Sequence, residues 1–481
     1  MAEEQTAGIT VKKDDDFGEW YNQLVLKAEL ADFTAIKGFM AIRPNGYNIW
    51  EKIQAYLDAR FKETGHKNSY FPALIPESFL TKEAQHIEGF APEAFWISHE
   101  GENEVEERLA LRPTSETIMY DSYSKWIKSW RELPLLLNVW CSVFRYETKM
   151  TKLFLRTREF LWQEGHTVHA TREDADIEVR QQLDTYKDLC ESLLAIPVIQ
   201  GVKTDRERFA GALTTTTIEG LMPDGKALQM GTSHNLGQNF SKAFKIKFID
   251  KDEKKKFAWQ TSWGVSTRLI GALIMVHGDD KGLVLPPKIA ETKAVVVPIL
   301  FEDSKKKVLD ASRKIAEKLS KDIVVHFDDR ENYSAGWKFN EWELVGVPLR
   351  IEIGPKDVEK KQAVVVRRDT GKKTFVKISE LNKFASDELE KMQKDMLSSA
   401  RKFLKDNTHE VKSYTEFKKV MDSSRGFIIA QWCGSEDCEI RIQEETTATV
   451  RCIPFNKGNG SGKCVLCAKK SQYRAYFAKS Y

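Results

Sequence analysis

Two stretches carry residues suited to nucleotide chemistry: FRYE at residues 144–147 and RTREFLWQEGH at residues 156–166. The pattern predicts a strand, a loop and a returning strand, with Arg145 and Glu147 on one face of the first strand because strand side chains alternate. Arginine forks bind phosphate oxygens, a ring such as Phe160 stacks on a base, and a carboxylate binds a polar edge. The combination indicates a nucleotide site.

Glycine-rich phosphate loops are absent, because the chain has neither a GxxxxGK[ST] nor a GxGxxG motif. Any ATP would therefore be held by arginines on an antiparallel sheet. An arginine and a carboxylate two residues apart on a strand also form ordinary cross-strand surface pairs, so the short motif alone leaves both interpretations open.

Five of the seven cysteines cluster near the end of the sequence. Cys464 and Cys467, in CVLC, have the spacing of a zinc knuckle, and Cys433 and Cys438 can supply the other half of a four-thiolate site. Zinc would stabilise a segment with few core residues, and reduced free thiols are the alternative. Cys452 lies in an apolar context and is left out of the predicted ligand set.

The composition is that of a globular protein, with 481 residues, 41% hydrophobic content, 30% charged content and a net charge of +3. Two to four domains are expected. No apolar run approaches the roughly 20 residues that span a membrane, and the charged residues 1–16 lack the apolar core of a signal peptide. We therefore expect a flexible leader over 1–16, a cytoplasmic location and no membrane association.

The elements that position the motifs fall into a first body, predicted over residues 17–287. Apolar spacing predicts a helix over 46–64, and a strand is expected in SYFPALIP at 69–76. A Glu-rich loop is expected at 100–107. The stretch at 263–279 predicts a strand, then Arg268, then an apolar helix.

A second body is predicted over 288–400 and a third over 401–481. Four β-branched runs (295–300, 323–327, 348–354 and 362–368) with a helix at 303–320 predict a small α/β domain with a mixed sheet. The third body would begin with a helix at 379–405 and end in the cysteine cluster. Its residues 451–481 hold seven Lys or Arg and no Asp or Glu, so they could contact RNA phosphates or an acidic part of the chain's own first body.

The sequences LRPTSE (111–116), RTREFLWQEGH (156–166) and GTSHNLGQNFSKAF (231–244) resemble those of class II aminoacyl-tRNA synthetases, and prolyl-tRNA synthetases in particular. The resemblance covers nearly the whole chain. The helix from residue 46 and the strand ending near Pro72 resemble motif 1, residues 144–166 motif 2 and residues 263–279 motif 3. Only about a hundred residues separate His166 from Arg268, which leaves no room for the large editing insertion of bacterial-type enzymes. With the cysteine-rich tail, the chain resembles the archaeal/eukaryal type.

The resemblance implies an α/β multidomain protein: a class II antiparallel-sheet catalytic domain, an α/β anticodon-binding domain and a small C-terminal zinc-binding α+β domain. It implies ATP-dependent ligation of L-proline to tRNA(Pro), through prolyl-adenylate with release of pyrophosphate and then transfer to the 3′-terminal adenosine. It also implies Mg2+, a structural Zn2+, a homodimer through motif 1 and, without an editing domain, a separate trans-editing deacylase.

The resemblance also implies roles for individual residues. Arg145 would bridge the proline carboxylate and the α-phosphate, and Arg268 would hold the phosphate tail, so these two are the expected catalytic residues. The expected ATP-binding residues are Arg145, Glu147, Arg156, Thr157, Phe160, Gln229, Thr232, Ser266 and Arg268. The expected proline-binding residues are Phe90, Thr114, Glu116, Arg145, Trp162, Glu164, His166 and His234. Ser266 stands where the family has a threonine and keeps only the hydroxyl.

Two alternatives stay open on the sequence. One is an inactive synthetase-like regulator or RNA-binding module, which would usually lose a motif arginine or a pocket carboxylate. The other is a threonyl or glycyl synthetase, although the threonyl type places a zinc in the catalytic domain, where only Cys141 and Cys190 lie here. Candidate RNA contacts in the second body are Lys338, Glu341, Arg350 and Glu352, and a structural or solvated role is the alternative for each of them.

Overall fold

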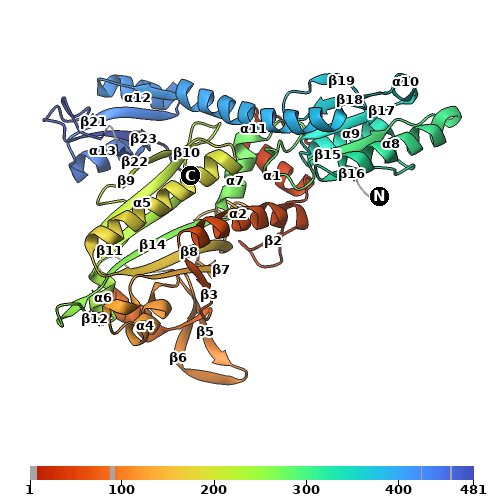
Figure 1. Ribbon diagram of the computed structural model, residues 1–481. Coiled ribbons are helices and arrows are strands. Elements are labelled where there is room, and N and C mark those ends of the chain that lie inside the picture. The colour runs from red at the N-terminus through yellow and green to blue at the C-terminus, as the bar shows by residue number, and fades with distance from the viewer. Residues whose placement is uncertain (1–7, 87–92, 424, 456–457) are drawn as a thin grey trace.

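A computed structural model describes residues 8–86, 93–423, 425–455 and 458–481. Its main feature is a long sheet that runs through the first and third bodies (Figure 1). Within the described residues this sheet has eleven strands, in the order β20-β21-β23-β22-β9-β10-β11-β14-β8-β7-β3. Its first-body strands are β3 (Lys67–Ser69), β7 (Leu135–Phe144), β8 (Glu159–His169), β9 (Ile199–Val202), β10 (Thr214–Leu221), β11 (Ala227–Gly237) and β14 (Trp259–Ser266).

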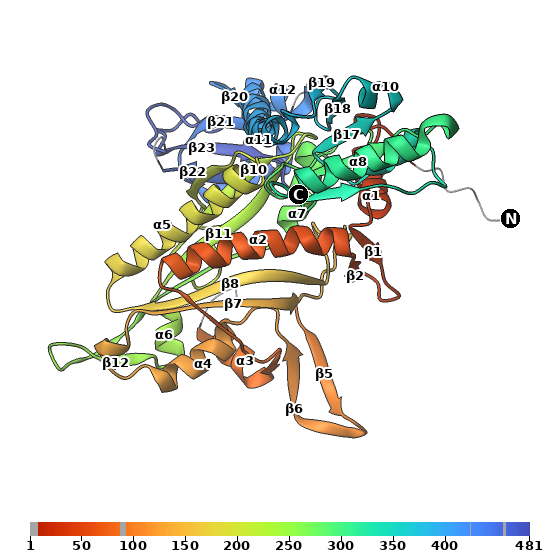
Figure 2. The same cartoon turned by 45° about the vertical axis from the view of Figure 1, so that its right-hand side comes forward.

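Helices cover both faces of this part of the sheet, and Figures 1 and 2 show them on opposite sides. One face packs against helices α1, α2, α5 and α7 in a large apolar core that includes Trp263 and Val265 of β14. The other face packs against α4 and α6. The bounds are α1 (Phe17–Lys27), α2 (Pro44–Glu63), α4 (Glu116–Trp126), α5 (Arg172–Asp188), which continues into η2 (Leu189–Leu193), α6 (Asn239–Ala243) and α7 (Arg268–His277).

Smaller elements surround the sheet, and two differ from the expectations. The segment 69–76 is not one strand, because it breaks between β3 and β4. The Glu-rich segment 100–107 is mostly strand rather than loop, since β5 and β6 pair in an exposed hairpin. Both faces of that hairpin meet solvent, so its strands lack the apolar alternation that predicts a strand. The bounds are β1 (Ala31–Phe33), β2 (Met40–Ile42), β4 (Leu74–Pro76), α3 (Glu77–His86), β5 (Phe95–Glu100), β6 (Asn103–Leu111), η1 (Trp130–Glu132), β12 (Lys247–Ile249) and β13 (Lys255–Phe257).

The second body has the predicted mixed sheet, in the order β16-β15-β17-β18-β19. β16, β15 and β17 are parallel, whereas β17, β18 and β19 are antiparallel. Helix α8 covers one face and α9 the other. The bounds are β15 (Ala294–Pro298), η3 (Glu302–Ser304), α8 (Lys305–Leu319), β16 (Val325–Phe327), α9 (Ala335–Leu344), β17 (Leu349–Ile353), α10 (Pro355–Glu359), β18 (Gln362–Arg367) and β19 (Lys373–Lys377).

The four candidate RNA contacts of this body all have partners within the chain. Lys338 is buried and its Nζ donates to the Asp328 carbonyl at 3.0 Å. Arg350 pairs with Glu343 at 2.8 Å and with Glu352 at 2.9 Å, and Glu341 pairs with Arg330. These contacts give each side chain a structural role.

The long helix α11 (Leu381–Asp406) links the second and third bodies along one side of the molecule (Figure 1). It continues past the predicted domain boundary at residue 400. In the third body, β22 pairs antiparallel with β9 of the first, which joins the two into one sheet. The remaining bounds are β20 (Thr408–Glu410), α12 (Tyr414–Ser423), β21 (Phe427–Trp432), α13 (Glu436–Thr446), β22 (Thr449–Pro454) and β23 (Tyr473–Ala478).

The basic third body docks on the first through specific polar contacts. Arg451 pairs with buried Glu219 at 2.9 Å. The Tyr481 hydroxyl donates to Asp224 at 2.8 Å, and its backbone N–H donates to the Ala227 carbonyl. No helix in the described ranges is long and apolar enough to span a membrane.

Candidate active site

A cavity of about 290 Å³ opens on the sheet face that carries α4, above β8, β11 and β14. Side chains alternate along β8, so Phe160, Trp162, Glu164 and His166 all face this cavity. The intervening Gln163 turns to the other face, where it accepts a hydrogen bond from Tyr186 of α5 at 2.6 Å. The sequence alternation of β8 therefore fixes which side chains form the site.

A glycine is required between the two polar residues of β8. A Cβ atom at Gly165 would lie 2.1 Å from the ring of Trp263, which packs across it from β14. Any side chain at this position would push the strands apart. The sequence WQEGH thus places Glu164 and His166 on one face and leaves room for an indole on the other.

Glu116, Glu164 and His166 form a buried polar cluster at one end of the cavity. His166 Nε2 lies 3.0 Å from the Glu164 carboxylate, which also accepts hydrogen bonds from the hydroxyl and backbone N–H of Ser115. The Thr114 hydroxyl donates to Glu116. Ser115 precedes α4 and Glu116 is its first residue, so the start of this helix contacts Glu164 of β8 and supplies the second carboxylate of the cluster.

The pKa values of the three side chains in this cluster are shifted in different directions. Burial works against ionised Glu164, but the hydrogen bonds from His166 and Ser115 outweigh it and hold the pKa of Glu164 below its usual value. Burial likewise works against protonated His166, but Glu164 and then Glu116 raise its pKa. Burial raises the pKa of Glu116, with His166 opposing the shift and Glu164 adding to it. Glu164 and His166 therefore form an ion pair, and Glu116 is the carboxylate that an incoming cation would ionise.

Arg145 enters the cavity from a loop rather than from the strand that the sequence predicted. β7 ends at Phe144, and the Glu147 N–H then donates to the Arg145 carbonyl at 2.7 Å in a tight turn. Alternation is lost there, so Arg145 and Glu147 do not share a strand face. The Arg145 guanidinium lies 5.4 Å from the ring centre of Phe160 and 5.2 Å from that of Trp162, and its Nε donates to the Pro113 carbonyl.

Arg268 is the second cation of the cavity, at the first residue of α7. Its Nε donates to the Leu155 carbonyl and its Nη1 to the Gln229 carbonyl, both at 3.4 Å. Burial, followed by repulsion from Arg145 and Arg156, lowers its pKa to about 10. Neither Arg145 nor Arg268 has a carboxylate ion-pair partner within the described residues. The site is therefore prepared for an anionic ligand.

Most of the predicted site residues meet in this cavity. Those that line it are Thr114, Glu116, Arg145, Phe160, Trp162, Glu164, His166, Gln229, Thr232, His234, Ser266 and Arg268. Three lie outside the lining: Glu147 and Arg156 pair with each other at 3.2 Å, and the Thr157 hydroxyl donates to the Glu159 carbonyl. Phe90 falls outside the described residues.

The structure adds lining residues that the sequence interpretation missed, among them Glu207, Phe209 and Thr215. Glu207 and Phe209 belong to the irregular segment between β9 and β10. The Phe209 and His234 rings lie 4.8 Å apart. This segment has no periodic pattern, so only a polar and aromatic sequence such as DRERF hinted at a binding loop.

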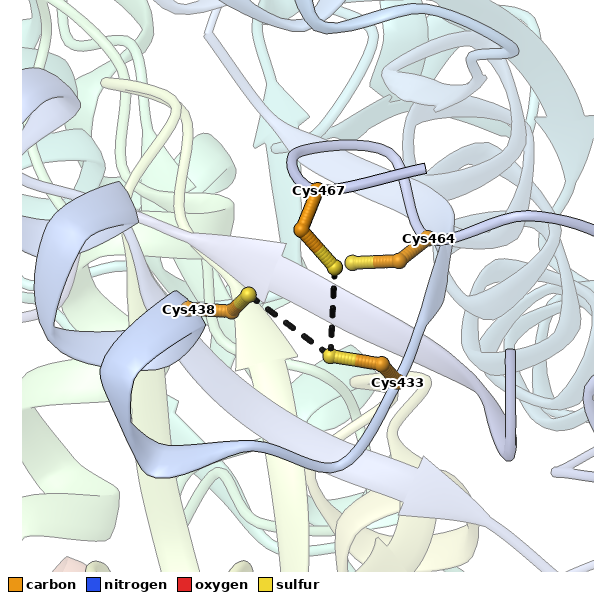
Figure 3. Close-up of side chains that lie close together, drawn as sticks. All are labelled: Cys433, Cys438, Cys464 and Cys467. Carbon is orange, nitrogen blue, oxygen red and sulfur yellow. Dashed lines mark hydrogen bonds between the residues drawn. The ribbon is translucent and has the colours of Figure 1, made fainter. Parts of the chain in front are cut away.

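The four predicted cysteine ligands converge in the third body (Figure 3). The sulfur of Cys433 lies 3.6 Å from that of Cys438 and 3.7 Å from that of Cys467. A tetrahedral zinc with bonds of about 2.3 Å sets its sulfur ligands about 3.8 Å apart. Cys452 does not belong to the cluster: it is buried where β22 meets β9, and its sulfur lies close to Gly201. The donor set fits zinc.

Three family profiles match successive parts of the chain. "tRNA synthetase class II core domain (G, H, P, S and T)" matches residues 95–277, "Anticodon binding domain" residues 293–388, and "Prolyl-tRNA synthetase, C-terminal" residues 414–481. A proline–tRNA ligase of Natranaerobius thermophilus is 52% identical over 471 residues, which cover 98% of this chain and 97% of the relative. The chain belongs to the proline–tRNA ligase family.

Other members of the ligase family are equally similar over their whole length. Proline–tRNA ligase 2 of Clostridioides difficile is 52% identical over 100% of this chain and 99% of its own. A proline–tRNA ligase of Cenarchaeum symbiosum is 51% identical over 98% and 99%. The match to proline enzymes sets aside the threonyl and glycyl alternatives. A class II ligase of this family uses ATP and Mg2+ and joins proline to tRNA(Pro) in two steps.

Proposed function

We propose that the cavity on β8, β11 and β14 is the site of proline activation, with Arg145 at the reacting centre. The observation that carries this assignment is the position of Arg145. Its guanidinium lies beside the rings of Phe160 and Trp162 and lines the same cavity as Arg268 and Glu116. Its charge contributes to lowering the pKa of Arg268, and the charge of Glu116 acts in turn on the pKa of Arg145, so Arg145 is close to both. Arg145 can therefore bind the proline carboxylate and the α-phosphate of ATP together.

The proposed ATP site uses the positively charged half of the cavity. Arg268 holds the phosphate tail of ATP. Arg156, whose charge already acts on Arg268, joins it at the phosphates when its ion pair with Glu147 breaks. Phe160 stacks on the adenine ring, while Gln229, Thr232 and Ser266 supply polar contacts. Glu147 and Thr157, which lie outside the lining, would orient the motif 2 loop around the nucleotide. Mg2+ arrives with ATP as part of the substrate and is bound chiefly through its phosphates.

The proposed proline site uses the other half. Glu116, oriented by Thr114, accepts a hydrogen bond from the secondary ammonium of proline. Trp162 and His234 form walls for the pyrrolidine ring, with the Glu164–His166 ion pair behind them, and Phe90 is expected to complete the wall. The slot selects a compact cation with an adjacent carboxylate.

Catalysis in this site is mainly positioning. The proline carboxylate attacks the α-phosphate in the first step, and the tRNA 3′-terminal ribose hydroxyl attacks the adenylate in the second. The carboxylate is already ionised, so the first step needs no protein base. Negative charge builds on phosphorus and on the departing pyrophosphate, where Arg145 and Arg268 stabilise it.

The cysteine cluster is proposed as a structural zinc site with ligands Cys433, Cys438, Cys464 and Cys467. When bound, zinc supplies a cross-link between β21, the start of α13 and the CVLC turn. The donor set is four thiols without an open position for a substrate, which favours a structural over a catalytic role.

Two partner proposals extend the family assignment. A homodimer through the motif 1 region is supported by exposed apolar side chains there, such as Tyr47 on α2 and Tyr70, which is 76% exposed. A separate deacylase would clear mischarged tRNA, since a pyrrolidine slot discriminates against alanine chiefly by lost apolar contact, worth about 1–3 kcal/mol per methylene. Purified ligase should then not hydrolyse alanyl-tRNA(Pro) above the spontaneous rate, and clear hydrolysis would contradict the proposal.

The proposed function is tested by amino-acid-dependent exchange of labelled pyrophosphate into ATP, with the purified ligase and a panel of all twenty amino acids. Proline should give the dominant exchange, with alanine and cysteine far weaker. Exchange driven best by another amino acid, or by none, would contradict the assignment of the cavity.

A further inference from the structure

The hydroxyl of Thr215 connects the pocket histidine to the loop that covers it. Thr215 of β10 lies directly opposite His234 of β11 in the sheet ladder. Its Oγ1 accepts the backbone N–H of Phe209 at 2.9 Å and lies 2.9 Å from Nδ1 of His234. The Phe209 ring packs beside the imidazole, with centres 4.8 Å apart. One hydroxyl therefore joins β10, β11 and the loop before β10.

The single hydrogen of the Thr215 hydroxyl determines the direction of its hydrogen bond with His234. A threonine hydroxyl has one hydrogen to donate and two lone pairs. The Phe209 N–H occupies one lone pair. Within the described residues, Nδ1 of His234 is the one acceptor in reach of the hydroxyl hydrogen. Satisfying every group therefore requires the hydroxyl to donate to Nδ1, which leaves Nδ1 without a proton.

The charge of the His234 imidazole determines the protonation of its other nitrogen, Nε2. Burial, and next the nearby His166, lowers the pKa of His234 to about 3, so the imidazole is neutral at physiological pH. A neutral imidazole with a bare Nδ1 carries its proton on Nε2. Nε2 has no hydrogen-bond partner within the described part of the chain, and His234 lines the cavity. Nε2–H is therefore available to a ligand.

We propose that Thr215 is a positioning residue that fixes His234 as the Nε2–H tautomer, so that the imidazole donates to an oxygen of the bound amino acid or its adenylate. This inference rests on the proposed proline site. The opposite tautomer would face that oxygen with a lone pair, which repels it. A neutral donor also adds no charge beside the ammonium of the substrate, which a protonated imidazole would repel.

Three variants separate the hydroxyl from the shape of the side chain. Thr215→Val keeps the β-branched volume and removes the hydroxyl. Thr215→Ser keeps the hydroxyl and removes the methyl. Thr214→Val is the matched control, because Thr214 is the adjacent residue of β10 and does not line the cavity. Thermal melting checks that each variant folds.

The first readout is kinetic. Losing one oriented hydrogen bond corresponds to a change of about tenfold. Thr215→Val should raise KM for proline about tenfold while KM for ATP stays within about twofold, and Thr215→Ser and Thr214→Val should behave as wild type. A Thr215→Val variant with unchanged KM for proline, or with KM raised equally for both substrates, would overturn the proposal.

The second readout is independent of proline activation. Two-bond nitrogen–proton correlation spectra of the full-length ligase labelled with 15N-histidine report the tautomer, and the His234 signals are assigned by their loss in His234→Gln. Wild type should show His234 protonated on Nε2, and this result stands even if the cavity activates another amino acid. A Nδ1–H tautomer in wild type would overturn the proposal whether or not Thr215→Val folds.

Discussion

Arg451 and Glu219, from two different bodies of the chain, form a buried ion pair. Nε and Nη2 of Arg451 lie 3.1 Å and 2.9 Å from one Glu219 oxygen, and the other oxygen accepts from Lys203 at 2.8 Å. Burial works against ionised Glu219, but the two cations outweigh it and lower its pKa. Glu219 and Arg451 also influence the pKa of Arg268, so the C-terminal body contributes to the field around the proposed phosphate site.

Breaking this pair should destabilise the whole protein. Arg451→Met removes one of the two cations that pair with buried Glu219 and leaves Lys203 as the other. Removing one partner of a buried ion pair costs about 3–5 kcal/mol, and the remaining Lys203 places the expected cost at the lower end of that range. The matched control is Arg474→Met, because Arg474 pairs with Glu410, which is 61% exposed, and such surface pairs contribute about 0–1 kcal/mol. Thermal unfolding should show a clear loss of Tm for Arg451→Met only. Equal Tm values for the two variants would contradict a structural role for the buried pair.

Proline binding should weaken as the pH falls, because Glu116 must be ionised to accept the ammonium. Burial raises the pKa of Glu116 in the free enzyme, whereas a bound cation lowers it again. Between these two values, binding releases a proton, and the Kd rises up to about tenfold for each unit of falling pH.

Calorimetric titration of proline in buffers of different ionisation enthalpy measures this proton release. Glu116→Gln should bind weakly and lose that component of the pH dependence, while any contribution from His166, whose pKa is raised, persists. Tighter binding at lower pH, or an unchanged profile in Glu116→Gln, would show that Glu116 does not receive the ammonium.

The cysteine cluster should hold about one zinc per chain. Cys464→Ser removes one of four thiolates and should lose the metal and lower Tm. Cys452→Ser is the control, since that buried thiol lies outside the cluster and should leave the zinc content unchanged. Mass spectrometry measures the zinc content per chain of the wild type and of both variants. Full zinc in Cys464→Ser together with loss in Cys452→Ser would replace Cys464 by Cys452 in the ligand set.

The resemblance to the synthetase family predicted that Trp162, Glu164 and His166 belong to one site, and the alternation of side chains along β8 explains why they do. The CVLC spacing predicted one half of the cysteine cluster. The same alternation failed beyond Phe144, because the chain turns there and Arg145 is presented by a loop. The pairing of β22 with β9 joins segments about 250 residues apart and leaves no local signal. Thr215 was missed because its role depends on a cross-strand neighbour and a loop amide, neither of which is visible in its own strand.

The most direct test of the account is the rate of proline-dependent pyrophosphate exchange in Arg145→Ala. Arg145 is proposed to bind both reactants at the reacting centre, and loss of such a contact costs about 3 kcal/mol or more, over a hundredfold in kcat/KM. Arg131→Ala, at an exposed arginine outside the cavity, is the control and should exchange at the wild-type rate. The account predicts at least a hundredfold loss in Arg145→Ala with an unchanged Tm. Exchange within about tenfold of wild type would contradict it.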